Sequence, residues 1–310
     1  MTRLPDLLDD LAETDSVGHA LRRLAEAEPR DPIATVNLDA VMRRRKDLER
    51  ELGALLGVDQ RDLIRYRLEL FDGSAPPAAA VARSVLLFQS LVTTVFDAIR
   101  TGPKRVYHPS NESVRLSSLS FASAPAGKPE MHFTIPNDRL LIVESDLDTA
   151  FGIVFELLTA RAKTMFRNIA VRAGVASVAA AYAWADNAAQ HSLTTTITWR
   201  KASDERRTIS LAHSDALLFK TAVEALTDDA VEPVECDCEL LSIDEAAATF
   251  RIENADGVTI SGELASGFPR GENWTTRRWY IAILHRATRV RYATGEEIVR
   301  WSLRALNPHH

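Results

Sequence analysis

A chain of 310 residues is long enough to bury a substantial core, and such chains more often form two or three domains than one. Its 46% hydrophobic and 26% charged residues are typical of a soluble globular protein, and a net charge of −6 excludes bulk attraction to nucleic acid or to an anionic membrane. Two cysteines are too few for a disulfide framework and fit a reducing compartment, so we expect a cytoplasmic protein.

The N-terminal decapeptide is too acidic, and its apolar run too short, for a secretory signal peptide. The stretch nearest to a membrane span, residues 173–185, is uncharged but well short of the roughly 20 residues that a span needs. We therefore expect no membrane contact.

The start of the chain predicts a helical cap. Residues 4–11 and 17–24 each carry apolar side chains at helical spacing, which predicts two short helices, and two prolines then interrupt the chain. Asn37 stands where an N-cap is expected and Gly57 where a helix commonly ends, so a third helix is predicted between them.

The middle of the chain alternates strands and helices. An apolar stripe at steps of four and three residues predicts a long central helix or helix pair over residues 146–190, with Gly174 as its first kink. The elements predicted around it are a strand at 64–70, a helix at 81–99, short strands at 114–122, 131–135 and 139–144, a hairpin of 193–199 with 208–211, and a helix at 214–226. This arrangement predicts an α+β domain with helices on one face of a mostly antiparallel sheet.

The last part of the chain predicts strands alone. Alternating apolar and polar residues indicate five or six short strands, at 234–240, 250–253, 258–264, 279–284, 288–292 and 298–306. The Asp256-Gly257 pair is a strong hairpin signal. Strands of this number and length predict a small all-β barrel of the OB or SH3-like kind. The predicted domains are a helical cap at 1–58, an α+β domain at 61–228 and a small barrel at 232–310.

Motifs of the commonest enzyme classes are absent. The sequence has no Gly-x-x-x-x-Gly-Lys phosphate loop, no Gly-x-Gly-x-x-Gly, no Gly-x-Ser-x-Gly and no His-Glu-x-x-His. Cys236 and Cys238 alternate with charged residues and share a strand face with Val234 and Leu240, so they are predicted to pack in the core. No further Cys or His cluster completes a zinc site, and we expect no cofactor.

One acidic cluster offers an enzymatic alternative. Glu144, Asp146 and Asp148 stand where a predicted strand ends and the long helix begins. Carboxylates in that position can hold Mg²⁺, which would make the protein a metal-dependent phosphodiesterase or nuclease. The simpler interpretation is that Asp146 and Asp148 cap the helix and complement its dipole.

The C-terminal strands carry an unusual number of arginines. Between Arg270 and Arg304 the sequence has eight arginines against three glutamates, and it has no lysine after Lys220. On the last predicted hairpin, alternation places several arginines on one outward face, with tryptophans just upstream. The candidate binding residues are Arg277, Arg278, Arg289, Arg291, Arg300, Arg304, Trp274 and Trp279. Arginine forks suit phosphate or carboxylate groups, and aromatic faces suit bases.

These observations favour a non-enzymatic assembly or adaptor subunit that contacts a macromolecular partner through its barrel and arginine face. We expect this partner to be a protein or a second copy of the chain, with nucleic acid as the other candidate, because an arginine-rich surface can serve either purpose.

Overall fold

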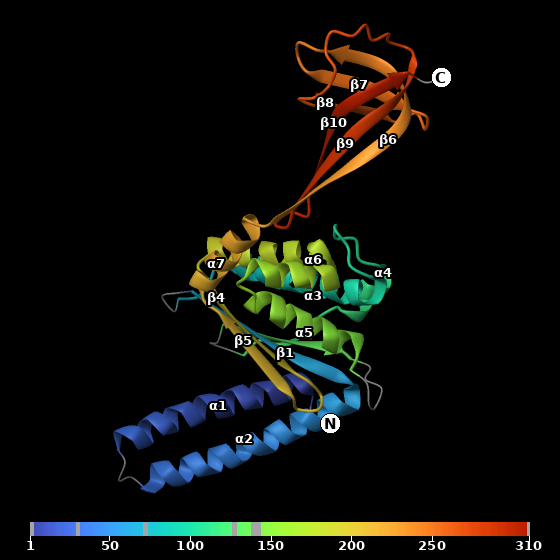
Figure 1. Ribbon diagram of the computed structural model, residues 1–310. Coiled ribbons are helices and arrows are strands. Elements are labelled where there is room, and N and C mark those ends of the chain that lie inside the picture. Colours follow the sequence, from blue (N-terminus) through green and yellow to red (C-terminus); the bar gives the residue numbers. More distant parts are fainter. Residues whose placement is uncertain (1–2, 29–31, 71–73, 126–128, 138–143, 309–310) are drawn as a thin grey trace. The chain divides into compact units, whose positions relative to one another are not determined.

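The computed structural model describes residues 3–28, 32–70, 74–125, 129–137 and 144–308 (Figure 1). These residues form both helices and mostly antiparallel strands, so the predicted α+β class is confirmed. Their contacts group into two compact units, Met1–Val223 and Glu224–His310. The segment predicted as a helical cap belongs to the same unit as the five-stranded sheet that follows it.

Two long helices open the N-terminal unit, α1 (Leu4–Ala27) and α2 (Pro32–Asp59), and they pack on each other as an antiparallel hairpin (Figure 1). Their shared core lies at the end nearest the sheet, where leucines meet one sheet residue. The members of this cluster are Leu7, Leu8, Leu11, Leu48, Leu52, Leu56 and, from the sheet, Leu63.

The helix bounds differ from those predicted. Residues 4–11 and 17–24 belong to one continuous helix rather than two short ones. The second helix begins at Pro32, not after Asn37, because proline is well tolerated in the first turn. It also continues beyond Gly57 as far as Asp59, so this glycine does not end it.

Five antiparallel strands form the sheet of this unit in the order β2-β3-β1-β4-β5. They are β1 Arg61–Leu70, β2 Ser120–Ser123, β3 Glu130–Pro136, β4 Leu193–Arg200 and β5 Arg206–Leu211. One face of β1 packs on helices: the Tyr66 ring lies 5.2 Å from that of Phe88, and its hydroxyl accepts a hydrogen bond from Trp184 Nε1 over 2.8 Å. Residues of the opposite face, such as Leu63, point to the hairpin.

Three helices pack on one another in the layer on the Tyr66 side: α3 (Ala78–Thr101), α5 (Asp146–Thr159) and α6 (Lys163–Gln190). The other helices outside the hairpin are the short α4 (Asn111–Leu116) and α7 (His213–Glu224). Among the described helices, α3 alone has the length and composition of a membrane span, and half of its most apolar window is buried in the fold. Core helices of soluble proteins meet the same criteria. The expectation that residues 173–185 are the nearest approach to a span was therefore wrong.

One of the short predicted strands differs from the structure. Residues 114–122 were expected as a strand, but the first of them belong to α4, and the strand β2 begins later, at Ser120. The Ser110 hydroxyl accepts a hydrogen bond from the Ser113 amide over 3.1 Å, which is the N-cap interaction that starts this short helix. The strand predicted at 139–144 lies outside the described residues except for Glu144.

The element predicted at 146–190 is a helix pair. The chain leaves helical geometry at Ala160, whose φ of −62° and ψ of 138° are extended, although no proline or glycine marks this break. The kink predicted at Gly174 is confirmed, with a φ of 80°. A Cβ atom there would lie 2.2 Å from the backbone oxygen of Lys104, so the close approach of the loop after α3 requires glycine.

The C-terminal unit contains five strands in a closed order, β10-β8-β7-β6-β9. They are β6 Thr227–Asp244, β7 Thr249–Asn254, β8 Thr259–Leu264, β9 Trp279–Arg291 and β10 Glu297–Pro308. The strands predicted at 279–284 and 288–292 are one continuous strand, β9, because its pairing with β6 has no interruption. The turn predicted at Asp256-Gly257 joins β7 to β8, and Gly257 has the positive φ of 78° that such turns need.

Three strands of this unit continue beyond its hydrophobic core. The core includes Leu284 of β9 and Leu303 of β10, whereas β6 and β9 stay paired as far as Thr227 and Arg291. We call this three-stranded extension, residues 227–233, 285–291 and 297–302, the arm.

The buried carboxylate of Asp97 in α3 holds Lys104, in the loop after this helix, against α6. Lys104 Nζ forms an ion pair with this carboxylate, and the backbone N–H of Ser110 donates to Asp97 Oδ1 over 3.0 Å. Burial acts to raise the pKa of Asp97, but these interactions together outweigh it and lower the pKa to about 2.

We expect Asp97→Asn to lower the free energy of unfolding by roughly 1–3 kcal/mol at neutral pH, because it removes hydrogen bonds to a buried charge. The folded-state pKa lies below the usual 3.8, so this stabilisation is complete above about pH 4 and is lost as the pH falls towards 2. Urea unfolding of both proteins across this range measures the effect. A stability difference that did not shrink with falling pH would contradict it.

Candidate functional site

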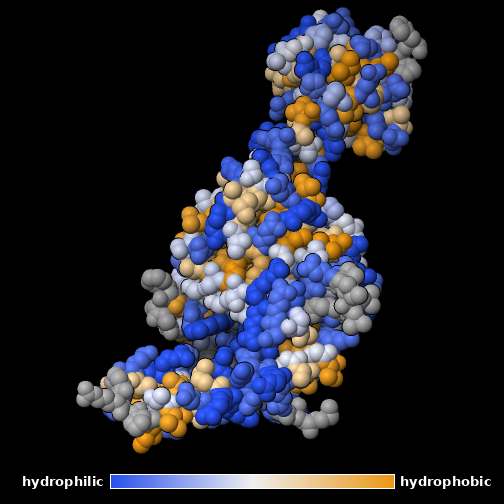
Figure 2. All heavy atoms as spheres, turned by 60° about the horizontal axis from the view of Figure 1, so that its bottom comes forward, coloured by the Kyte–Doolittle hydropathy of each residue, from blue (hydrophilic) through white to orange (hydrophobic). Residues whose placement is uncertain are grey.

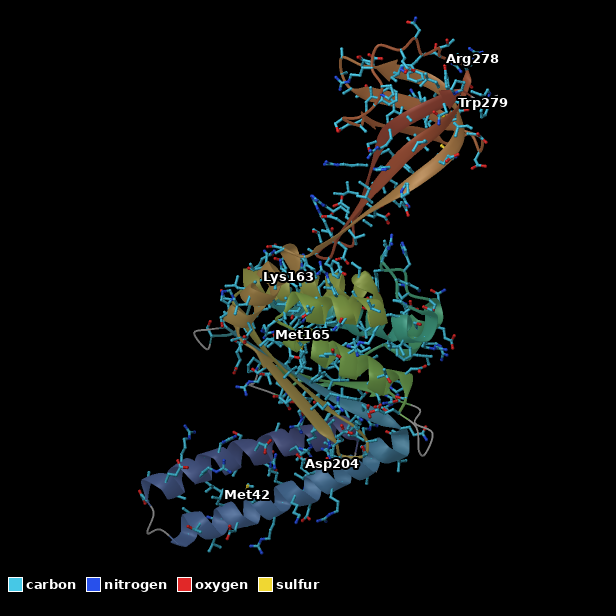
Figure 3. The ribbon with its side chains drawn as sticks, in the orientation of Figure 1. Met42, Lys163, Met165, Asp204, Arg278 and Trp279 are labelled. Atoms are coloured by element: carbon cyan, nitrogen blue, oxygen red, sulfur yellow. The ribbon has the colours of Figure 1, made fainter. Side chains whose placement is uncertain are left out.

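The candidate arginines of the C-terminal unit form two groups rather than one face. Arg277 and Arg278 precede the start of β9, and Trp279 is its first residue, whereas Arg289 and Arg291 lie at its other end (Figure 3). Ten residues of extended strand separate Trp279 from Arg289, which corresponds to about 33 Å. The expected single face is divided because β9 is one continuous strand of 13 residues and not two short ones.

At the arm end of β9, alternation and register bring side chains of three strands onto one face. Arg289 is paired with Asp229 of β6 and Ile298 of β10, and Ala287 with Val231 and Arg300. These residues surround a hollow of about 300 Å³ that we call the arm hollow. Its lining consists of Asp229, Ala230, Val231, Ala287, Thr288, Arg289, Arg291, Ile298 and Arg300.

Two of the three arginines at the arm hollow already have carboxylate partners. Arg289 binds Asp229 through two contacts of 2.6 and 3.2 Å, and the hydrogen bond from Arg289 lowers the pKa of that carboxyl below its usual value. Arg291 lies 3.5 Å from Glu296. The Arg300 side chain is exposed and forms no ion pair or hydrogen bond with any described residue. The hollow therefore offers one uncommitted guanidinium beside an apolar floor.

The group at the other end of β9 has a different character. Trp279 is 47% exposed, and Arg277 lies 3.6 Å from Glu239. Trp274 packs instead on the barrel core, with its ring 5.5 Å from that of Phe268, so it is not available for stacking on a base. Arg304 is exposed and sits at the register shift of β10, apart from both groups.

The acidic cluster at the start of α5 does not converge on one point. Ser145, not Asp146, is the N-cap, and Asp148 completes a capping box by accepting a hydrogen bond from the Ser145 amide over 3.1 Å. Asp146 lies 3.9 Å from Arg100, and Glu144 is exposed. Among the described residues no group of three His, Cys, Asp or Glu side chains is placed to hold a metal ion.

The two cysteines pack as predicted. Cys238 is fully buried in the barrel core, and Cys236 packs against that core. Burial raises the pKa of the Cys238 thiol to about 12, so the thiol stays protonated at neutral pH and is a poor nucleophile and metal ligand.

The N-terminal unit contains a polar cleft that the sequence did not indicate. A cavity of about 310 Å³ lies between α1 and the sheet, lined by Leu8, Leu11, Ala12, Asp15, His19, Arg65, Arg67, Pro129, Glu130 and His132. Arg65 and His132 are register partners on β1 and β3. Cations here could attract a small anion, although Asp15 and Glu130 line the same cleft and oppose that use.

His132 is held by a buried hydrogen-bond relay. Its Nδ1 lies 2.9 Å from Ser123 Oγ, and its Nε2 lies 2.7 Å from Glu130 Oε1. With Glu130 ionised, Nε2 carries the proton and Nδ1 accepts from the serine hydroxyl, which is the order of groups in a hydrolytic triad. Ser123 is only 7% exposed and does not line the cleft, so the relay orients His132 instead of presenting a nucleophile.

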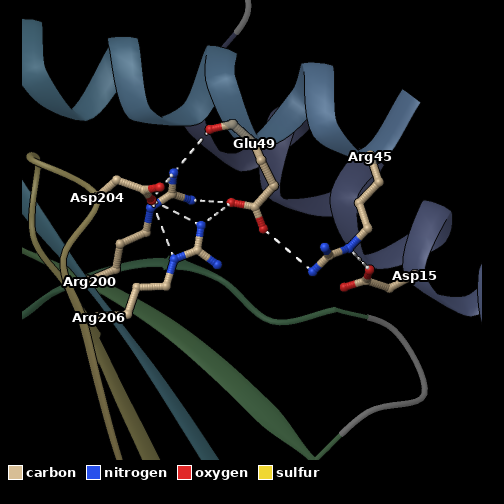
Figure 4. Close-up of polar contacts among 6 residues, drawn as sticks. All are labelled: Asp15, Arg45, Glu49, Arg200, Asp204 and Arg206. Atoms are coloured by element: carbon tan, nitrogen blue, oxygen red, sulfur yellow. Dashed lines mark hydrogen bonds and ion pairs between the residues drawn. The ribbon is translucent and has the colours of Figure 1, made fainter. Parts of the chain in front are cut away.

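A network of ion pairs connects the hairpin to the sheet (Figure 4). Glu49 of α2 accepts from Arg200 of β4 and from Arg206 of β5, both over 2.6 Å, and Arg200 Nη2 also donates to the backbone oxygen of Glu49 over 3.0 Å. Arg45 continues the network to Asp15 of α1 over 2.6 Å. The Glu49 and Arg200 side chains are 12% and 4% exposed, so this pair anchors the hairpin to the sheet, while Arg45 and Arg206 beside it line an open hollow of about 840 Å³.

Sequence reasoning missed both the relay and the network. Glu49 and Arg200 are 151 residues apart, and no spacing in the sequence links them. Ser123 and His132 come together through strand pairing of β2 with β3, which requires the register and not merely the strands. The one available signal was an arginine in an apolar, β-branched strand, since buried arginines are rare without a partner.

Comparison of the chain with protein-family models, with curated proteins and with solved structures found no match.

We expect Glu49→Gln to lower the free energy of unfolding of the N-terminal unit by roughly 1.5–3 kcal/mol, because it removes the charge-assisted hydrogen bonds from Arg200 and Arg206 and leaves Arg200 paired only with the exposed Asp204, 2.9 Å away. Urea unfolding followed by circular dichroism measures this change. The matched control is Asp47→Asn, which removes an exposed carboxylate paired with Arg50 and should cost about 0.5 kcal/mol or less. Equal losses for the two variants would show that the Glu49 cluster is not an anchor.

Proposed function

We propose that this protein is a non-enzymatic assembly or adaptor subunit that binds a protein partner through the arm hollow of its C-terminal unit. The observation that carries this proposal is the combination of an apolar floor with arginines at its rim. Val231 is 65% exposed on that floor, and Arg300 beside it has no partner among the described residues. Apolar side chains surrounded by arginine are characteristic of protein–protein hot spots.

The chemistry of the arm hollow defines the kind of partner. An apolar side chain of the partner can cover Val231, Ala287 and Ile298, while an acidic group can pair with Arg300. The edge of β6 is less suited to adding a strand from the partner, because Asp228, Asp229, Glu232 and Pro233 lie along it. Charges and proline on an edge oppose strand addition, so side-chain docking is the better supported mode.

Nucleic acid is the less favoured partner. The rim arginines Arg289 and Arg291 are matched by Asp229 and Glu296, so the local positive potential at the hollow is small. Of the two tryptophans considered for base stacking, Trp274 is engaged in the core.

We also propose that the closed five-stranded sheet is a barrel of the OB or SH3-like kind. Small barrels of this class commonly serve as binding modules.

The test compares two matched double variants of the full chain. Val231→Asp/Arg300→Glu changes the arm hollow, and Val258→Asp/Arg270→Glu makes the same chemical changes at exposed positions elsewhere in the C-terminal unit. Affinity purification from the source cells, followed by quantitative mass spectrometry, should recover the same partner protein with the wild type and with the control variant. The hollow variant should recover at least about 10-fold less of this protein.

A parallel measurement separates the two classes of partner. Fluorescence anisotropy of labelled single- and double-stranded DNA and RNA across a salt series should show no specific binding. Binding that falls steeply with salt and is lost in the hollow variant would replace the protein partner by nucleic acid. Equal recovery of every protein by both double variants would show that the arm hollow is not the docking site.

A further inference from the structure

The hairpin of the N-terminal unit has a coiled-coil seam that weakens away from the sheet. Its seam residues, alternately four and three apart, are Leu7, Leu11, Thr14, Gly18, Leu21 and Ala25 on α1, and Ala34, Leu38, Val41, Arg45, Leu48 and Leu52 on α2. From Gly18 outward, only Gly18 and Ala34 among these described residues are fully buried. A two-helix hairpin with so small a core is expected to need further packing, because helices in proteins are stabilised chiefly by tertiary contacts.

The outer half of the hairpin also exposes a patch of apolar side chains. It consists of Val17, Ala20 and Leu24 on α1, and of Ile33, Val36 and Ala40 on α2, and we call it the hairpin patch. Leu24 is 44% exposed, Val17 43% and Val36 63%. Figure 2 shows hydrophobic atoms gathered towards the far end of the hairpin at the lower left. Contiguous apolar surface of this kind usually marks an interaction site.

Both rows of the patch lie on the same flank of the hairpin. Successive helix residues are 100° apart, which places each row roughly 100° or more from its seam, on the side opposite to Asp15 on α1 and to Met42 on α2. Asp15 and Met42 line one common hollow across the seam, so they mark a single flank. Asp15 also lines the cleft against the sheet. The hairpin patch therefore faces away from the sheet.

We propose that the hairpin patch binds a second copy of this chain, so that two hairpins form a four-helix bundle about a two-fold axis along their length. In this arrangement α1 of one copy packs on α2 of the other, and each apolar row covers the opposite row of the second copy. The same contact is made twice, as a two-fold interface requires.

Charge at the end of the patch supports this occupant. The seam contact between Gly18 and Val41 fixes which residues of the two helices lie at one height. Glu13 is five residues nearer the sheet than Gly18, and Arg44 is three residues nearer than Val41, so their heights differ by about 3 Å. Where the apolar rows end, Glu13 of one copy therefore meets Arg44 of the second copy, which also lies 3.5 Å from Asp10 of its own chain, and acid faces base on both sides of the axis.

Sedimentation equilibrium of the full chain from about 1 to about 100 µM tests the proposal directly, and we expect a dimer. Leu24→Glu/Val36→Glu should raise the dimer dissociation constant on the order of 100-fold or more, because it buries charges in the interface. Met42→Glu introduces the same charge on the opposite flank, at a position 39% exposed, and should leave the dimer intact. A wild type that stays monomeric, or a double variant that stays dimeric, would overturn the proposal.

A charge exchange tests the two-fold arrangement without touching the apolar patch. Glu13→Arg alone and Arg44→Glu alone should each weaken the dimer, because each places like charges opposite each other. An equimolar mixture of the two variants should form a heterodimer, because its two charge pairs are both attractive: one is the native pair and the other is the same pair with the charges exchanged. Native mass spectrometry, with one of the two variants labelled with heavy isotopes, distinguishes the heterodimer from the two homodimers. A mixture no tighter than the separate variants would exclude this pairing of α1 with α2.

Discussion

The position of the helical hairpin on the sheet depends on one buried ion pair, that of Glu49 with Arg200. The apolar contact at the base of the hairpin is made by leucines, which resist separation but have little directional preference. The Arg200 fork binds both the carboxylate and the backbone oxygen of Glu49, so it fixes the rotation of α2 as well as its distance from β4. That rotation decides which flank of the hairpin faces the sheet and which carries exposed Val36 and Leu24.

The residue types of the arm change where the hydrophobic core of the C-terminal unit ends. Inside the core, alternate residues of β9 such as Leu284 are buried, and the residues between them, such as Ile283, are apolar as well. Beyond it residues 285–288 of the same strand are half-buried, and Arg289 and Arg291 are exposed on either side of the buried Val290. Strand pairing with β6 and β10 still fixes the register, so exposed side chains such as Arg289 and Arg300 are held on a regular frame.

Local patterns allowed the strands and helices of this chain to be predicted far better than their ends. Alternation identified β1 and β4, and the positive φ required at Gly174 and Gly257 was visible as glycine in the sequence. The break at Ala160 could not be predicted, because it is stabilised by packing and carries no local signal. The arginine residues of the C-terminal unit were recognised, but their division into two groups depends on the unbroken length of β9. The unpaired side chain of Arg300 depends on which carboxylates its neighbours reach.

The two proposals reinforce each other through valency. A hollow of about 300 Å³ with one free guanidinium, Arg300, can hold little more than one side chain and one acidic group, so a single contact of this size would bind weakly. A dimer formed through the hairpin patch carries two copies of the hollow. A partner with two docking segments, or a partner that is itself a dimer, would then bind the second hollow as an intramolecular event, which commonly strengthens binding by about 10²–10⁴-fold. Weak individual contacts joined by self-association are what an assembly subunit needs, because such contacts allow exchange of single partners while the complete complex stays together.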